Sequence, residues 1–132
     1  MKSYVLDSYA VLAFLKKERN WEKVQNILFM AIEEKAILYI SAVNYGEIFY
    51  TSLRTEGAVK TDSIMAAVDT LPINIISADR QMAMVAGEYK SRGGISYADC
   101  FAAALAKLKT AVVITGDKEF KEVEDDVNIF WI

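Results

Sequence analysis

The chain has 132 residues, of which 54% are hydrophobic, and a formal net charge of −3. These values suit one globular domain with a sizeable core, exclude extended disorder, and give no support to nucleic-acid binding through bulk positive charge. The chain contains no histidine and a single cysteine, Cys100, which excludes Ser-His-Asp and Cys-His catalysis, histidine metal sites, internal disulfides and cysteine zinc sites.

The sequence also shows no sign of a membrane or secretion segment. No apolar run approaches the roughly 18 residues of a membrane span, and residues 1–7 (MKSYVLD) lack the long apolar stretch of a secretion signal. We therefore expect a soluble, cytoplasmic protein without membrane association. If it is an enzyme, its chemistry must use carboxylates, hydroxyls, amines or a bound cofactor. Carboxylates without imidazole or thiolate suit hard cations such as Mg²⁺ or Mn²⁺.

Apolar periodicity predicts alternating strands and helices. In chain order we predict a strand over residues 4–6, helices over about 8–17 and 21–35, a strand over 37–40, helices over 42–55 and 60–70, a strand over 73–76, helices over 80–91 and 97–109, a strand over 111–114, a short helix from 117, and a fifth strand over 129–132. This alternation indicates right-handed crossovers, and the continuously apolar strands indicate helices on both faces of a parallel sheet. The predicted fold class is an α/β three-layer α/β/α sandwich with a central, mostly parallel sheet.

Two acids directly follow predicted strands. Asp7 follows the first strand, and Asp117 follows the fourth strand after Thr115-Gly116. Open parallel sheets bind ligands beyond the carboxyl ends of their strands, at the switch in strand order. If the first and fourth strands are neighbours there, both acids face one crevice, but the residues alone leave that order open. Each acid is also explained as the cap of a helix that follows it, because Asp is a favoured N-cap.

Asp99 and Glu47 lie on predicted helices. Asp99 is in the first turn of the helix over 97–109, which is apolar on nearly every side and should be buried. A buried carboxylate is costly unless it is paired or bound to a cation, although Ser96 and Asp99 also resemble a capping box. Glu47 lies in mid-helix, roughly opposite the apolar stripe of that helix. Its position alone favours a solvated charge over a ligand, although its side of the helix also carries Val43 and Tyr50, which suggests partial cover.

Carboxylates that converge need a counter-charge. Two like charges about 4 Å apart repel by roughly 4 kcal/mol at an effective dielectric constant of about 20, so several of them in one pocket oppose folding or become protonated. A divalent cation replaces the repulsion between the carboxylates by attraction to the metal. It can also orient a phosphodiester, lower the pKa of bound water and neutralise the charge on a leaving oxygen. The residues therefore support a hard-metal carboxylate site suited to phosphate esters, without specifying RNA.

Four segments together resemble the PIN-domain nucleases, and within them the VapC-like toxins of type II toxin–antitoxin systems. The segments are residues 5–15 (VLDSYAVLAFL), 41–47 (SAVNYGE), 95–104 (ISYADCFAAA) and 113–120 (VITGDKEF). Each segment alone is unspecific, but all four in this order and spacing are specific, and the resemblance covers essentially the whole chain. It implies a single PIN-like nuclease domain over residues 1–132 that cleaves RNA endonucleolytically.

The resemblance also implies the roles of particular residues. By motif, Asp7, Glu47, Asp99 and Asp117 are the catalytic acids that bind Mg²⁺ or Mn²⁺. All four are present, so nothing indicates an inactive member.

Other positions are expected to support these acids. Ser8 and Thr115 match small hydroxyl positions beside them, and Asn44 matches a position behind them. Lys118, next to Asp117, is the basic residue that we expect nearest to the RNA substrate. The family further implies a homodimer and a cognate antitoxin protein whose tail can insert a basic side chain into the acidic pocket.

Two other functions remain open at this point. A phosphoacceptor signalling domain of flavodoxin-like topology also binds Mg²⁺ with acids. It would need paired acids after the first strand and an Asp ending the third, whereas Asp7 has no acidic neighbour and Ser77-Ala78 precede Asp79. The other alternative is a non-catalytic PIN-like interaction module. The presence of all four acids argues against it.

Overall fold

The computed structural model describes all residues, 1–132. Its elements in chain order are β1 (Lys2–Leu6), α1 (Ser8–Leu15), α2 (Trp21–Ile32), β2 (Ala36–Ser41), α3 (Ala42–Glu56), α4 (Ala58–Thr70), β3 (Asn74–Ile76), α5 (Arg80–Arg92), α6 (Tyr97–Lys109), β4 (Val112–Thr115), the 3₁₀ helix η1 (Lys118–Val123) and β5 (Ile129–Trp131). Every predicted strand and helix is present, with boundaries that differ by a few residues. No helix combines the length and apolar character that crossing a membrane requires.

The five strands form one parallel sheet in the order β3-β2-β1-β4-β5. The chain builds outwards from β1 to β3 and then returns to place β4 on the other side of β1, where Leu6 is in register with Ile114. The switch in strand order therefore lies between β1 and β4, as the placement of the acids required. In a flavodoxin-like sheet the third strand lies beside the first, so that alternative is wrong in its topology.

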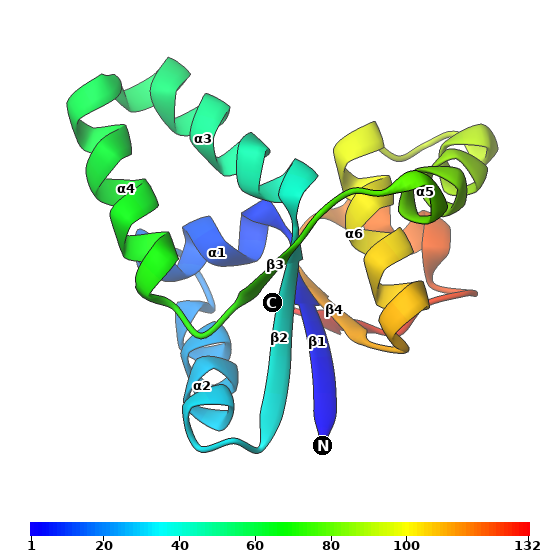
Figure 1. Cartoon of the computed structure of the whole chain (residues 1–132), viewed down its shortest axis with the longest axis horizontal. Helices are drawn as coiled ribbons and strands as arrows, with labels where there is room; N and C mark the ends of the chain where they lie inside the picture. Colours follow the sequence, from blue (N-terminus) through cyan, green and yellow to red (C-terminus); the bar gives the residue numbers. More distant parts are fainter.

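Helices cover both faces of the sheet (Figure 1). Side chains alternate along β1, so Leu6 packs into the core under α1 to α4 while Val5 packs into the core under α5 and α6. Ile114 and Val113 of β4 divide between the same two cores. The predicted three-layer sandwich is confirmed.

Helix α6 is the most deeply buried helix, and all of its residues from Asp99 to Ala106 are buried. Four of them are alanines, whose small side chains permit a close approach to the sheet. Since α6 leads directly into β4, its first turn lies at the end of the sheet where β4 finishes. This arrangement brings Asp99 to the carboxyl edge of the strands.

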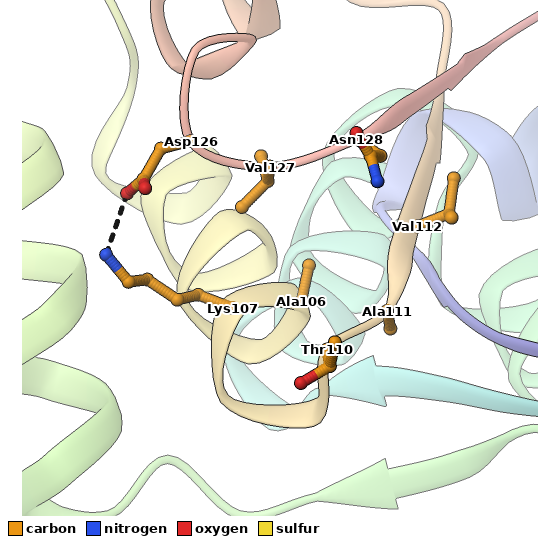
Figure 2. Close-up of a pocket in the computed structure, with 8 residues that line it drawn as sticks. All are labelled: Ala106, Lys107, Thr110, Ala111, Val112, Asp126, Val127 and Asn128. Atoms are coloured by element: carbon orange, nitrogen blue, oxygen red, sulfur yellow. Dashed lines mark hydrogen bonds and ion pairs between the residues drawn. The ribbon is translucent and has the colours of Figure 1, made fainter.

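The opposite end of the sheet carries a different hollow, between the end of α6 and the starts of β4 and β5 (Figure 2). Its two charged lining residues, Lys107 and Asp126, pair with each other at 2.9 Å. Asp126 also accepts the Tyr89 hydroxyl hydrogen, and these two hydrogen bonds lower the pKa of Asp126. The charges here are satisfied within the chain, so this end of the sheet serves to hold the segment before β5.

Candidate active site

A hollow of about 290 Å³ lies at the carboxyl ends of β1 and β4. Five of its ten lining residues are acids, namely Asp7, Glu47, Asp99, Asp117 and Glu119, and none is Lys or Arg. The structure thus brings all four predicted acids to one place and adds a fifth. Such a concentration of one charge sign is unfavourable without a positive partner.

Asp7 is the most buried of these acids, with 1% of its surface exposed. One carboxylate oxygen accepts the Ala10 N–H at 2.9 Å and so caps α1, as the capping interpretation predicted. The other oxygen accepts the Thr115 hydroxyl hydrogen. Burial raises the pKa of Asp7 to about 7, and the negative charges of Asp117 and Glu47 add to this rise, while the two hydrogen bonds oppose it.

Thr115 links two of the acids. Its oxygen donates a hydrogen bond to Asp7 and accepts the Asp117 N–H at 2.9 Å. Because Thr115 is fully buried at the end of β4, the bond fixes Asp7 against the strand that carries Asp117. Thr115 therefore lies beside the acids, as the sequence predicted.

Asp99 and Asp117 lie close together. Asp99 is buried, and burial, followed by the negative charge of Asp117, raises its pKa to about 8. Asp99, Asp117 and Glu119 each offer a carboxylate oxygen, and these oxygens lie within 4.8 Å of one another. Oxygen donors at this spacing suit one divalent cation.

Glu47 is half-buried rather than solvated, and it accepts the Ser8 hydroxyl hydrogen at 2.6 Å. The structure thus has the partial cover that the half-apolar side of the helix suggested, and the solvated charge that its position favoured is wrong. Helix α3 buries Asn44, Ile48 and Ser52. At about 100° per residue, this stripe is rotated by roughly 70° around the helix from the stripe that apolarity predicts. That rotation turns Glu47 towards α1.

The remaining predicted residues differ in their distance from the hollow. Ser8 lines it, whereas Asn44 is fully buried behind it and donates from Nδ2 to the Ala98 carbonyl at 3.1 Å. Asn44 thus ties α3 to the first turn of α6, next to Asp99. Lys118 is exposed and does not line the hollow.

Glu119 was missed by sequence reasoning. Residues two apart on an α-helix project to nearly opposite sides, but Asp117 precedes η1 as its extended N-cap and accepts the Glu119 N–H at 2.9 Å. The Glu119 carboxylate in turn accepts the Ser96 N–H at 2.7 Å, which holds it beside the start of α6. The only available signal was a second acid so soon after Asp117.

Replacing Thr115 by Val should reduce the free energy of unfolding by about 1–3 kcal/mol, because a buried carboxylate loses its donor. The loss should be largest above pH 7, where Asp7 is ionised. Urea unfolding at pH 8 measures it. Thr70→Val is the matched control, since the Thr70 hydroxyl donates only to the Ala67 carbonyl at an exposed helix end and its loss should cost under about 0.5 kcal/mol. Equal effects of the two changes would contradict the role of Thr115.

None of the curated proteins searched matches the chain. Among solved structures, VapBC2 from Rickettsia felis bound to promoter DNA superposes with a TM-score of 0.76 at 17% identity, over 97% of each chain. FitAcB from Neisseria gonorrhoeae gives a TM-score of 0.72 at 22% identity, over 96% of each chain. Both likenesses show the fold.

A third similar structure is VapC20 from Mycobacterium tuberculosis, described as a Sarcin-Ricin loop cleaving toxin, with a TM-score of 0.69 at 13% identity over 89% of this chain and 92% of that one. The sequence itself matches the model of the PIN domain over residues 4–126, which include all five acids of the hollow. The chain therefore belongs to the PIN domain family.

Proposed function

We propose that the protein is a metal-dependent endoribonuclease, a single nuclease domain over residues 1–132, that acts as the toxin of a toxin–antitoxin pair. The observation that carries this proposal is the hollow with five acids and no basic side chain at the strand-order switch of a PIN fold. Asp7, Glu47, Asp99 and Asp117 are its proposed catalytic and metal-binding acids. RNA is the proposed substrate because the resemblance to the PIN-domain nucleases implies it, and VapC20, which shares the fold, is described as a Sarcin-Ricin loop cleaving toxin.

The donor set fits a hard divalent cation. The hollow offers carboxylate and hydroxyl oxygens without nitrogen or sulfur ligands, which favours Mg²⁺ or Mn²⁺. Asp99, Asp117 and Glu119 are spaced to hold such an ion, and Asp7 and Glu47 lie at the same hollow to bind directly or through water. A cation bound there supplies charge neutralisation and a water of lowered pKa.

The surrounding residues hold the acids in place. Ser8 fixes Glu47 from the start of α1, and Thr115 joins Asp7 to the Asp117 backbone. The Ser96 hydroxyl accepts the Asp99 N–H at 3.2 Å. The carboxylates of Asp7 and Glu47, and the backbone that carries Asp99 and Asp117, are therefore oriented before substrate arrives, which lowers the cost of assembling the reactive geometry.

The proposed partners are an antitoxin and a second copy of the chain. Similar structures include a DNA-bound VapBC from Salmonella typhimurium and a toxin–antitoxin complex from Klebsiella pneumoniae. A basic side chain from an antitoxin would complement the all-acidic hollow. A homodimer would cover exposed apolar side chains of α3, such as Phe49 and Leu53.

Cleavage of single-stranded RNA of mixed sequence by the purified protein tests this function. Cleavage should require Mg²⁺ or Mn²⁺, stop with EDTA and return when the metal is restored. Full activity in EDTA contradicts the metal dependence. If no RNA is cleaved and calorimetry detects no divalent-metal binding, the non-catalytic interaction module becomes the better explanation.

The Glu119→Gln variant tests the fifth acid separately. It should bind Mn²⁺ about 10-fold or more weakly, because removal of groups around a metal commonly costs 10–100-fold in affinity. Calorimetric titration measures the change. Glu122→Gln is the control, since Glu122 lies on the same 3₁₀ helix and does not line the hollow. An unchanged Mn²⁺ affinity in Glu119→Gln would remove this residue from the site.

A further inference from the structure

Tyr9 stands apart from the other residues that line the acidic hollow. It is the only aromatic residue among them, and 46% of its surface is exposed. It is the second residue of α1 and therefore follows closely on Asp7. An apolar ring is thus presented at the mouth of a hollow that is otherwise made of carboxylates, hydroxyls and one leucine.

The far end of the Tyr9 ring lies against Gly116. A Cβ atom on Gly116 would lie 2.6 Å from Tyr9 Cζ and 2.9 Å from the phenol oxygen, inside contact distance. Gly57, Gly93 and Gly94 have positive φ angles, but Gly116 does not. Glycine at residue 116 leaves room for the end of the Tyr9 side chain in this position, and the backbone conformation there does not call for it. The far end of the ring therefore rests on the backbone immediately before Asp117.

The exposed part of the Tyr9 ring has no partner within the chain. Two other tyrosines are similarly exposed, but their rings are engaged. The Arg54 guanidinium lies 5.5 Å from the centre of the Tyr50 ring, and the Phe101 ring meets that of Tyr97 edge-on at 5.0 Å. Among the half-exposed tyrosines, only Tyr9 combines a ring that lies against Gly116, an open surface and a place at the acidic hollow.

From this geometry we propose that Tyr9 is a substrate-positioning residue, a stacking platform for a nucleobase next to the scissile phosphate of single-stranded RNA. This role rests on the proposed function. The hollow has no basic side chain to hold the RNA, whereas stacking on an aromatic ring needs no charge and tolerates any base. Unpaired bases of RNA are commonly held in this way. A base stacked on Tyr9 would place its backbone over Asp7 and Asp117.

Abasic substrates test the stacking directly. The substrate is an RNA oligonucleotide with one site that the wild-type protein cuts, with matched versions in which single bases around that site are removed. For the wild type, one abasic position should raise KM by about 5- to 150-fold and change kcat less. Tyr9→Phe should behave as wild type. Tyr9→Leu should have a raised KM on the intact RNA and no further rise on the abasic one.

Tyr50→Leu is the matched control, because Tyr50 is equally exposed and lies outside the hollow. It should keep the wild-type abasic penalty. Mn²⁺ affinity should be the same in wild type and Tyr9→Leu, which shows that the acids are undisturbed. A Tyr9→Leu variant with the wild-type KM and abasic penalty overturns the stacking role alone. Wild-type protein that cleaves no RNA with Mg²⁺ or Mn²⁺ contradicts the proposed function and removes this role with it.

Gly116→Ala provides a second test without changing Tyr9. The added methyl group must push the ring aside, so this variant should raise KM on the intact RNA and lose the abasic penalty. In a Tyr9→Ala background the ring is gone, and Gly116→Ala should have no further effect on KM. If Gly116→Ala raises KM by the same factor with and without Tyr9, the two substitutions act independently. That result would contradict the contact between the Tyr9 ring and Gly116 as the basis of stacking.

Discussion

The Asp7→Asn variant should lose at least about 10-fold of the metal-dependent RNA cleavage, since replacing a metal-binding acid should cost no less than the 10–100-fold typical of residues around a metal. It should fold as well as the wild type, because Asn caps helices as effectively as Asp and can still accept the Ala10 N–H. What it lacks is the negative charge. Cleavage rates with saturating Mn²⁺, together with thermal unfolding, measure both properties.

Asp79→Asn is the matched control for this change. Asp79 caps α5 as Asp7 caps α1, with a carboxylate oxygen that accepts the Met82 N–H at 2.9 Å, but it does not line the acidic hollow. The variant should keep the wild-type rate within about two-fold, as expected for a surface cap replaced by an equally good one. If Asp7→Asn retains activity, or if both variants lose it equally, the assignment of Asp7 is wrong.

The second large effect concerns stability without metal. The metal-free protein should become less stable as the pH rises from about 5 to about 8, with a fall in melting temperature of at least about 5 °C. The pKa of Asp7 is about 7 and that of Asp99 about 8 in the folded chain, against the ordinary 3.8. The folded state therefore binds more protons than the unfolded state across this range, and stability is lost as the pH rises through these values.

Melting curves in EDTA and in Mn²⁺, recorded from pH 5 to pH 8.5, measure this dependence. Mn²⁺ should raise the melting temperature most at high pH, where both carboxyl groups ionise and bind it. Asp99→Asn should flatten the slope in EDTA, because it removes the group with the higher of the two values. A stability in EDTA that is constant or increases with pH would contradict the buried, metal-free acids described above.

Much of the fold could be predicted because its signals are local. Apolar runs mark β1 and β4, and glycines with positive φ end α3 and α5 at Gly57 and Gly93. The strand order could not be predicted, because the pairing of β1 with β4 joins residues more than a hundred positions apart. That pairing is what turns Asp7 and Asp117 from two separate helix caps into neighbours.

The candidate site was less predictable where tertiary packing overrides local pattern. On α3 the apolarity of Phe49 and Leu53 suggests a buried face, but both are exposed while Ser52 is buried. The helix packs through a neighbouring stripe, and Glu47 gains its contact with Ser8 as a result. Glu47 could be assigned only by the family resemblance, because the residue pattern of a single helix does not predict which other elements that helix packs against.

The central claim is that the acidic hollow binds a divalent cation for RNA cleavage. An anomalous difference map from a crystal of the wild-type protein soaked in Mn²⁺ tests it most directly. The map should show a peak within about 2.0–2.4 Å of oxygens of Asp99 and Asp117, and soaked crystals of Asp99→Asn should lose it. A hollow without a peak, in crystals of protein that cleaves RNA with Mn²⁺ in solution, would contradict the account.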